Sequence, residues 1–196
     1  RTNHVIREDL DKREKVCTFI EEDYSGEVEV LHLLEILRDE IGFESLARKV
    51  VSPFSGLPVA AYYGCLLLRP PEEVGIDDPE SPSVLEEFLS ALGCDPVEYP
   101  YKTECCGSYV VLQPGEPAVS PSRLVVESAK SRGAKVIVTS CPLCQFNLDY
   151  AQSGNVERGE NAVPVVYFTQ LLAVALGLGE EVLEFDGHIV PPGLIF

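Results

Sequence analysis

Four short apolar runs alternate with helix-like segments over most of this chain. The runs cover residues 58–63, 96–99, 134–139 and 163–168. The segments with the apolar spacing of amphipathic helices cover residues 83–92, 122–132, 144–151 and 169–178. Strands that alternate with helices are joined by crossovers, which place them side by side in one direction. The sequence therefore predicts an α/β fold with a parallel sheet and alternating helices.

Five of the seven cysteines follow three of these strand runs. They stand as Cys65, then Cys105-Cys106-Gly107, then Cys141-Pro142-Leu143-Cys144, with 39 and 34 residues between the three groups. The carboxyl ends of parallel strands meet at one edge of a sheet, where ligands and cofactors bind. We therefore expect the cysteines to lie on loops at this edge and to converge on one site.

Thiolates in this arrangement indicate a metal centre. Deprotonated cysteine is a soft, anionic ligand and the usual one for iron–sulfur clusters. A Cys-x-x-Cys pair where a strand leads into a helix directs two sulfurs at one centre, and the N–H groups of the helix start stabilise their charge. Pro142 suits the first helical turn, and Gly107 permits positive φ or a close backbone approach.

Zinc is the alternative to an iron–sulfur cluster. A structural zinc ion is usually bound by four ligands from two close pairs. Here a single cysteine, a vicinal pair and a Cys-x-x-Cys pair provide five thiols. That number favours a cluster, while a zinc-binding docking module without a redox role stays a hypothesis.

Charge and composition restrict the partners and the compartment. The net charge is −17, with 32 acidic and 15 basic residues, which argues against nucleic acid and anionic membranes and favours a basic partner subunit. The odd cysteine count, the chain length and the lack of a secretory signal favour free thiols in a reducing, cytoplasmic compartment. The longest apolar stretch, 162–179, contains Pro164, Thr169 and Gln170 and is interpreted as a strand and a helix, so we expect no membrane span.

The first quarter of the chain has a different pattern. We expect a polar helix over 5–24, a short strand over 28–31, and helices over 32–41 and 43–50. A turn-forming run at 52–56 marks a boundary between a helical linker segment, 1–52, and the cysteine-bearing domain, 53–196. The chain has no methionine and opens within a helix-like segment, so we expect it to be part of a longer protein.

The cysteine pattern resembles that of the cysteine-rich CCG domain. The stretch from Arg132 to Cys144 is especially similar to it. Residues 1–3, 29–34 and 186–191 resemble the family of heterodisulfide reductase B subunits, which carry two CCG domains in tandem. The resemblance covers nearly the whole chain, and it corresponds to the C-terminal CCG domain with its preceding linker. The five-cysteine signature is specific for the CCG domain, and it is much less specific for heterodisulfide reductase as the enzyme.

The resemblance implies a noncubane [4Fe-4S] cluster. Its ligands would be Cys65, Cys105, Cys106, Cys141 and Cys144, with Gly107 beside them. The family implies reductive cleavage of the coenzyme M–coenzyme B disulfide between two such clusters, with electrons from partner subunits. This chain has one motif, so it would hold one cluster, and residues 1–52 would be what remains of an absent N-terminal half.

A second interpretation keeps the domain and changes its role. CCG domains also resemble electron-transfer subunits of quinone-linked dehydrogenases for lactate, glycolate, glycerol phosphate or succinate. Six residues outside the motif are expected to be structural: Cys17, Cys94, His32, Tyr62, Tyr63 and Tyr101. His4 shares no ligand spacing with the other two histidines. For His188 a structural position is also favoured, with an approach to the cluster edge or the substrate as the alternative.

Overall fold

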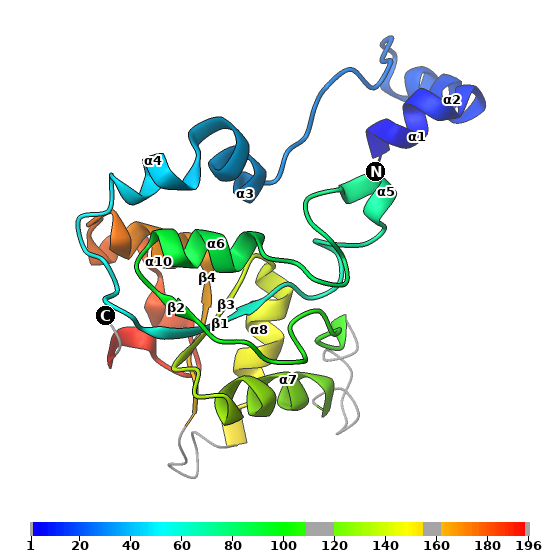
Figure 1. Ribbon diagram of the computed structural model, residues 1–196. Coiled ribbons are helices and arrows are strands. Elements are labelled where there is room, and N and C mark those ends of the chain that lie inside the picture. The colour runs from blue at the N-terminus through cyan, green and yellow to red at the C-terminus, as the bar shows by residue number, and fades with distance from the viewer. Residues whose placement is uncertain (1, 109–119, 155–161, 195–196) are drawn as a thin grey trace.

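A four-stranded parallel sheet forms the centre of the computed structural model, which describes residues 2–108, 120–154 and 162–194 (Figure 1). The strand order is β2-β1-β3-β4. The strands are β1 (Pro58–Tyr62), β2 (Asp95–Pro96), β3 (Val136–Thr139) and β4 (Val165–Tyr167). All three neighbouring pairs run parallel, with Val59 opposite Val136 and Ile137 opposite Val165. The predicted parallel α/β fold is confirmed.

Alternate residues of each strand face opposite sides of the sheet and form two cores. On one side, Val59 and Val138 pack with the helices α6 (Val84–Ala91) and α10 (Phe168–Ala175). On the other side, Ala60 and Ile137 pack with α7 (Ser120–Ser131) and α8 (Pro142–Tyr150). Figure 1 shows the two helix pairs on opposite faces of the sheet. Because β1 and β3 are buried on both faces, their sequences are almost entirely apolar.

The edge strand β2 is shorter than the expected run 96–99. Asp95 still donates its N–H group to the residue before β1, and Val97 donates its N–H group to a carbonyl of β1, at 2.8 Å each. Beyond Val97 the chain leaves the ladder, and the Tyr99 side chain packs in the core with its hydroxyl donating to the carbonyl of Ala61 at 2.9 Å. At this point the Tyr99 hydroxyl therefore takes the place of a backbone N–H donor to β1.

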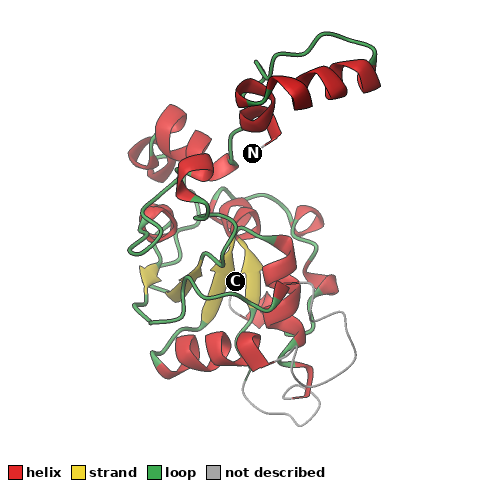
Figure 2. Cartoon of the chain, turned by 90° about the vertical axis from the view of Figure 1, so that its right-hand side faces the viewer, coloured by secondary structure: helices red, strands yellow, loops and turns green. Residues whose placement is uncertain are grey.

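An N-terminal arm projects from the domain (Figures 1 and 2). It consists of α1 (Thr2–Glu8), α2 (Leu10–Ile20) and an extended segment. The expected single helix over 5–24 is interrupted at Asp9, whose side chain caps α2 by accepting from the N–H of Lys12. The expected strand at 28–31 is wrong, because this segment pairs with none of the described strands and its Val28 carbonyl instead accepts from Asn3.

Three short helices connect the arm to the sheet. They are α3 (Leu33–Glu35), the π-helix η1 (Ile36–Ile41) and α4 (Phe43–Ala47). Leu34, Leu37 and Leu46 bury their side chains in the core beside α6. The remaining short elements are α5 (Pro71–Val74) and the 3-10 turns η4 (Glu180–Val182), η5 (Phe185–Gly187) and η6 (Pro192–Leu194). The division of the chain near residue 52 stays a prediction.

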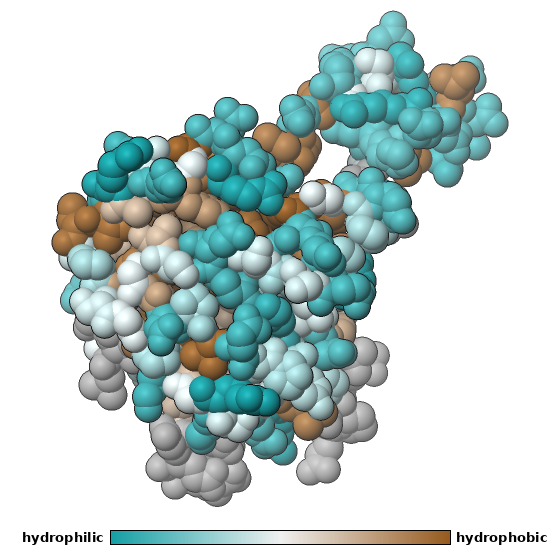
Figure 3. All heavy atoms as spheres, in the orientation of Figure 1, coloured by the Kyte–Doolittle hydropathy of each residue, from teal (hydrophilic) through white to brown (hydrophobic). Residues whose placement is uncertain are grey.

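The surface is largely hydrophilic in the view of Figure 3, as the net charge requires. Apolar spheres stand out on the projecting arm, where Leu10, Phe19 and Val30 are well exposed. Within the described residues no helix is long and apolar enough to cross a membrane.

Candidate metal centre

The three cysteine segments follow the carboxyl ends of the strands. Cys65 comes shortly after β1, Cys141 is the N-cap of α8 directly after β3, and Cys144 lies in the first turn of α8. Cys105 and Cys106 lie in the loop that follows β2. The strand-to-helix junction after β3 is the one expected from the sequence, with Pro142 at the first helical position.

The fold brings these sulfurs together across the segments. Cys106 Sγ lies 3.6 Å from Cys144 Sγ, although 38 residues separate them in sequence. The thiol of Cys65 interacts with that of Cys105, and the thiol of Cys141 with that of Cys144. The predicted convergence at one sheet edge is therefore present in the structure.

The five side chains differ in exposure to solvent. Cys106 and Cys144 are buried, Cys65 and Cys141 are half-buried, and Cys105 is exposed. The site thus has an inner side formed by α8 and an outer rim at Cys105.

Two thiols have lowered pKa values. The hydrogen bond with Cys144 lowers the pKa of Cys106 to about 6, helped by the Ser108 N–H and the Asn147 amide. The hydrogen bond with Cys144 and the N–H groups at the start of α8 lower the pKa of Cys141 to about 6. Both shifts favour the thiolate, which is the form that binds metal.

The pKa values of two other thiols, Cys144 and Cys65, are raised. Hydrogen bonding to Cys106 and Cys141 raises the pKa of Cys144, and burial acts in the same direction. Burial and the neighbouring Cys105 raise the pKa of Cys65. Binding of a metal by these two sulfurs would release protons.

Glycine provides space and turn geometry beside the sulfurs. Gly64 has φ +65°, and a Cβ atom there would lie 3.0 Å from Cys144 Sγ. Gly107 has φ +98°, so the positive φ expected for it is observed. The next residue, Ser108, also has positive φ, at +50°. The backbone around the cysteines therefore adopts conformations that few other residues tolerate.

Two buried polar residues at the site were not predicted from the sequence. Asn147 donates its amide N–H to Cys106 Sγ at 3.3 Å and to the Ser108 carbonyl at 2.9 Å. Ser122, on α7, donates its hydroxyl to the Cys106 carbonyl at 2.6 Å. Helical spacing could have indicated Asn147, since it is one turn beyond Cys144 on the same helix face. No sequence signal indicated Ser122.

The donor set fits a thiolate-bound metal centre. Two sulfurs that bind one metal ion tetrahedrally at about 2.3 Å are about 3.8 Å apart, close to the separation of Cys106 and Cys144. Over the described ranges, no three His, Cys, Asp or Glu side chains are arranged to hold one metal ion. Cys144 contacts both Cys106 and Cys141, and Cys65 contacts Cys105, so the five thiols are spread over neighbouring positions that fit a group with several metal ions.

Most other candidate residues have structural contacts. The Cys17 thiol forms hydrogen bonds with the backbone of Tyr24 in the arm. Cys94 is buried in the core, and burial raises its pKa to about 12, which disfavours its thiolate. His4 is exposed on α1. His32 caps α3. Cys17, Cys94 and His32 therefore have structural positions, as expected.

The tyrosines and His188 support the segments around the site. Tyr62 donates its hydroxyl to the Glu104 carbonyl at 2.7 Å, directly before the vicinal cysteines. Tyr63 contacts Glu86 and Leu85, and Tyr101 packs against the core. His188 Nε2 lies 3.2 Å from the amide nitrogen of Gln145 and 3.1 Å from that of Gln170. It therefore holds the C-terminal segment against α8.

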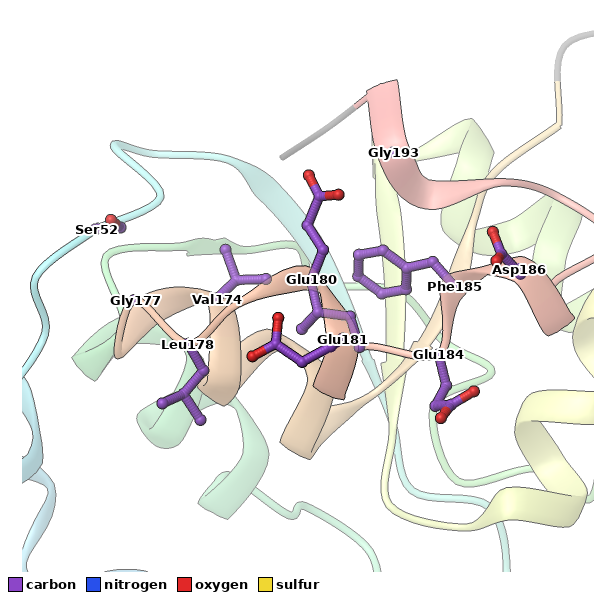
Figure 4. Close-up of a pocket in the computed structure, with 11 residues that line it drawn as sticks. Ser52, Val174, Gly177, Leu178, Glu180, Glu181, Glu184, Phe185, Asp186 and Gly193 are labelled. Carbon is purple, nitrogen blue, oxygen red and sulfur yellow. The ribbon is translucent and has the colours of Figure 1, made fainter.

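A cavity of about 620 Å³ lies away from the cysteines (Figure 4). The end of α10 and the acidic segment after it line this cavity, including Glu180, Glu181 and Glu184. Figure 4 shows these carboxylates around Phe185. None of the five motif cysteines lines it. The candidate functional site is therefore the group of five cysteine thiols at the strand ends, and not this cavity.

Comparison with known proteins identifies the domain. The profile of the family "CCG: Cysteine-rich domain" matches residues 59–149. The B subunit of the ferredoxin/F420H2-dependent CoB-CoM heterodisulfide reductase of Methanosarcina acetivorans is 33% identical over 172 residues, which is 86% of this chain and 57% of that protein. An Archaeoglobus profundus protein, named for its likeness to the heterodisulfide reductase B subunit, is 30% identical over 178 residues, covering 87% of this chain and 59% of that protein.

A third relative has another role. The 8-methylmenaquinol:fumarate reductase membrane anchor subunit of Wolinella succinogenes is 32% identical over 169 residues, or 85% of this chain and 59% of that protein. The chain thus spans a little under three fifths of these relatives.

A solved structure shows the same fold. The crystal structure of a hypothetical protein from Helicobacter pylori superposes with a TM-score of 0.69 at 12% identity, covering 95% of this chain and 34% of that one. Residues 59–149 thus match the cysteine-rich CCG domain, and the chain is similar over most of its length to B subunits of heterodisulfide reductases.

Proposed function

We propose that this chain is an iron–sulfur oxidoreductase subunit that reductively cleaves a disulfide. Its cofactor would be a noncubane [4Fe-4S] cluster bound by Cys65, Cys105, Cys106, Cys141 and Cys144. The observation that carries the proposal is the convergence of these five thiols, from three distant segments, at one edge of the sheet. Thiolate ligands in this number suit an iron–sulfur group.

The residues around the thiols have distinct roles in this proposal. Cys106 and Cys144 would hold the inner side of the group, where burial excludes water. Cys105 would hold the outer side, so that a substrate sulfur approaches there. Tyr62 fixes the loop that carries the vicinal pair through its bond to Glu104. The bound cluster would supply electrons to the sulfur–sulfur bond of the substrate.

The substrate and partners follow from the named relatives. The coenzyme B–coenzyme M heterodisulfide is the substrate in the names of the Methanosarcina proteins. Cleavage of a disulfide to two thiols takes up two electrons and two protons, so partner subunits must supply electrons. In this proposal the chain would provide the C-terminal one of two cluster domains, as its resemblance to these subunits implies. The cytoplasmic location stays a prediction.

Metal and sulfide analysis tests this proposal. Protein purified without oxygen is expected to contain about four iron and four sulfide per chain, with a paramagnetic signal after oxidation with thiol present. Cys106→Ala should lose that signal and most of the iron. Cys17→Ala is the matched control, because Cys17 bonds with the Tyr24 backbone in the arm. Full iron and sulfide in Cys106→Ala would contradict the ligand assignment, and zinc without sulfide would indicate a structural docking module.

A second function is favoured by the Wolinella relative. The chain would then relay electrons in a quinone-linked dehydrogenase or reductase, with the same cluster ligands. The intact complex distinguishes the two functions. Reduction of coenzyme M–coenzyme B disulfide supports the first, whereas quinol-dependent fumarate or related turnover without disulfide reduction supports the second.

A further inference from the structure

Asn147 is a buried amide whose placement the core does not explain. Its side chain is 1% exposed, and its Oδ1 has no hydrogen-bond partner among the described residues. A buried, unpaired carbonyl oxygen destabilises a fold, and a leucine of similar size would avoid that cost. What the amide contributes are its two N–H contacts, to Cys106 Sγ and to the Ser108 carbonyl.

These contacts hold an unusual turn. Gly107 and Ser108 both have positive φ, which a serine adopts only when its surroundings require it. Asn147 on α8 binds the turn at Ser108, and Ser122 on α7 binds it at the Cys106 carbonyl. Two helices therefore fix the turn from two sides, and the result is the 3.6 Å approach of Cys106 Sγ to Cys144 Sγ.

A second buried amide, in the turn that follows α8, shows the contrast. Gln152 is 2% exposed, and both ends of its amide are paired with backbone groups of Leu148 and Val163. It contacts none of the cysteines in these bonds. Gln152 therefore has a structural role, and it provides a matched control for Asn147.

We propose that Asn147 is a positioning residue for the metal centre, which holds the Cys106 sulfur against Cys144 and raises the reduction potential of the bound cluster. This inference rests on the proposed iron–sulfur function. A reduced cluster carries one more negative charge than an oxidised one, and part of that charge lies on the ligand sulfurs. An N–H donor to such a sulfur stabilises the reduced state more, and hydrogen bonds to sulfur are one determinant of cluster potentials.

Two substitutions separate this role from packing. Asn147→Leu keeps the volume and removes the N–H donor, and Asn147→Asp keeps the shape, removes the donor and adds negative charge. Gln152→Leu is the control, since it also removes a buried amide from the same region. The full chain is purified without oxygen, and its iron, sulfide, circular dichroism and reduction midpoint are measured.

We expect Asn147→Leu to shift the ratio of oxidised to reduced cluster about tenfold at a given potential, which lowers the midpoint by about 59 mV for one electron. Asn147→Asp should lower it further. Gln152→Leu should lower the thermal midpoint of unfolding and leave the potential unchanged. Loss of the cluster from a folded Asn147→Leu, while Gln152→Leu keeps it, would also support the positioning role.

Other outcomes overturn the inference. An unchanged midpoint in Asn147→Leu with full iron shows that the amide has no role at the cluster. An equal shift, or equal cluster loss, in Gln152→Leu shows that Asn147 acts only through stability. In both cases the wild type still contains iron and sulfide, so the proposed function stands. Zinc without sulfide in the wild type overturns that function and the inference with it.

Discussion

His32 Nδ1 accepts a hydrogen bond from the backbone N–H of Leu34 at 3.2 Å, so a neutral imidazole caps helix α3. Glu35 completes the capping box by accepting from the His32 N–H at 2.6 Å. The imidazole ring also packs beside Phe168, at the start of α10. The cap thereby joins the connecting helices to the face of the sheet that α10 covers.

This cap predicts an acid-sensitive contribution to stability. Burial lowers the pKa of His32 below its usual value of 6.5. The folded state therefore binds fewer protons than the unfolded state, so the contribution is present above about pH 6.5 and is lost as pH falls through the lower folded-state pKa. We expect a loss below about 1 kcal/mol, because the ring is only half-buried.

The measurement is urea unfolding of the wild type and His32→Asn between pH 5 and 8. Asparagine is a good N-cap that does not titrate in this range. Stability of the wild type relative to the variant should decrease as pH falls below about 6.5. A constant difference across this range would contradict the capping role of the neutral ring.

Asp149 joins the C-terminal segment to the cysteine-bearing helix. Its buried carboxylate accepts from the N–H groups of Ile189 at 2.7 Å and Val190 at 3.0 Å. Asp149→Ala leaves both donors without this acceptor and should lower the free energy of unfolding by about 1–3 kcal/mol. Denaturant unfolding measures this loss. Asp186→Ala, which removes an exposed carboxylate, should change stability by less than about 0.5 kcal/mol.

Gly64→Ala tests the space beside Cys144. The new Cβ would lie 3.0 Å from Cys144 Sγ, and alanine at φ +65° is strained. We expect lower iron content together with lower stability. Gly133→Ala is the control, because Gly133 also has positive φ but a Cβ atom there would have no described neighbour within 4 Å. Equal iron loss in both variants would assign the effect to backbone strain alone.

Lys102 supports the loop that precedes the vicinal cysteines. Its largely buried ammonium group lies 2.7 Å from Glu86 Oε1, and its carbonyl accepts from the Tyr63 N–H at 2.9 Å. Lys102→Met removes the charge beside a half-buried carboxylate, so stability should fall by about 2 kcal/mol and loop protection from hydrogen exchange should decrease. Glu98→Gln, at the exposed 3.7 Å pair with Lys102, should have little effect. Unchanged exchange in Lys102→Met would contradict this supporting role.

Several elements were predictable because local pattern and burial agree. The apolar runs at β1 and β3 are buried on both faces of the sheet, so their composition indicates strands directly. Pro142 at the first turn of α8 marks the strand-to-helix junction. The prediction of a strand at 28–31 was wrong because local pattern and tertiary pairing disagree there. The segment's alternation of apolar and polar residues resembles a strand, but a strand needs a neighbour to pair with, and none of the described strands pairs with this segment.

The sequence by itself determined the parallel α/β class and the placement of five cysteines at one sheet edge, because side-chain periodicity and parallel topology follow from local composition. Only the tertiary structure decided which sulfurs meet and what holds them. The contact of Cys106 with Cys144, and the bonds of Asn147 and Ser122 to the turn between them, join segments that no local pattern relates. They arise because packing of α7 and α8 on the same face of the sheet brings these side chains together.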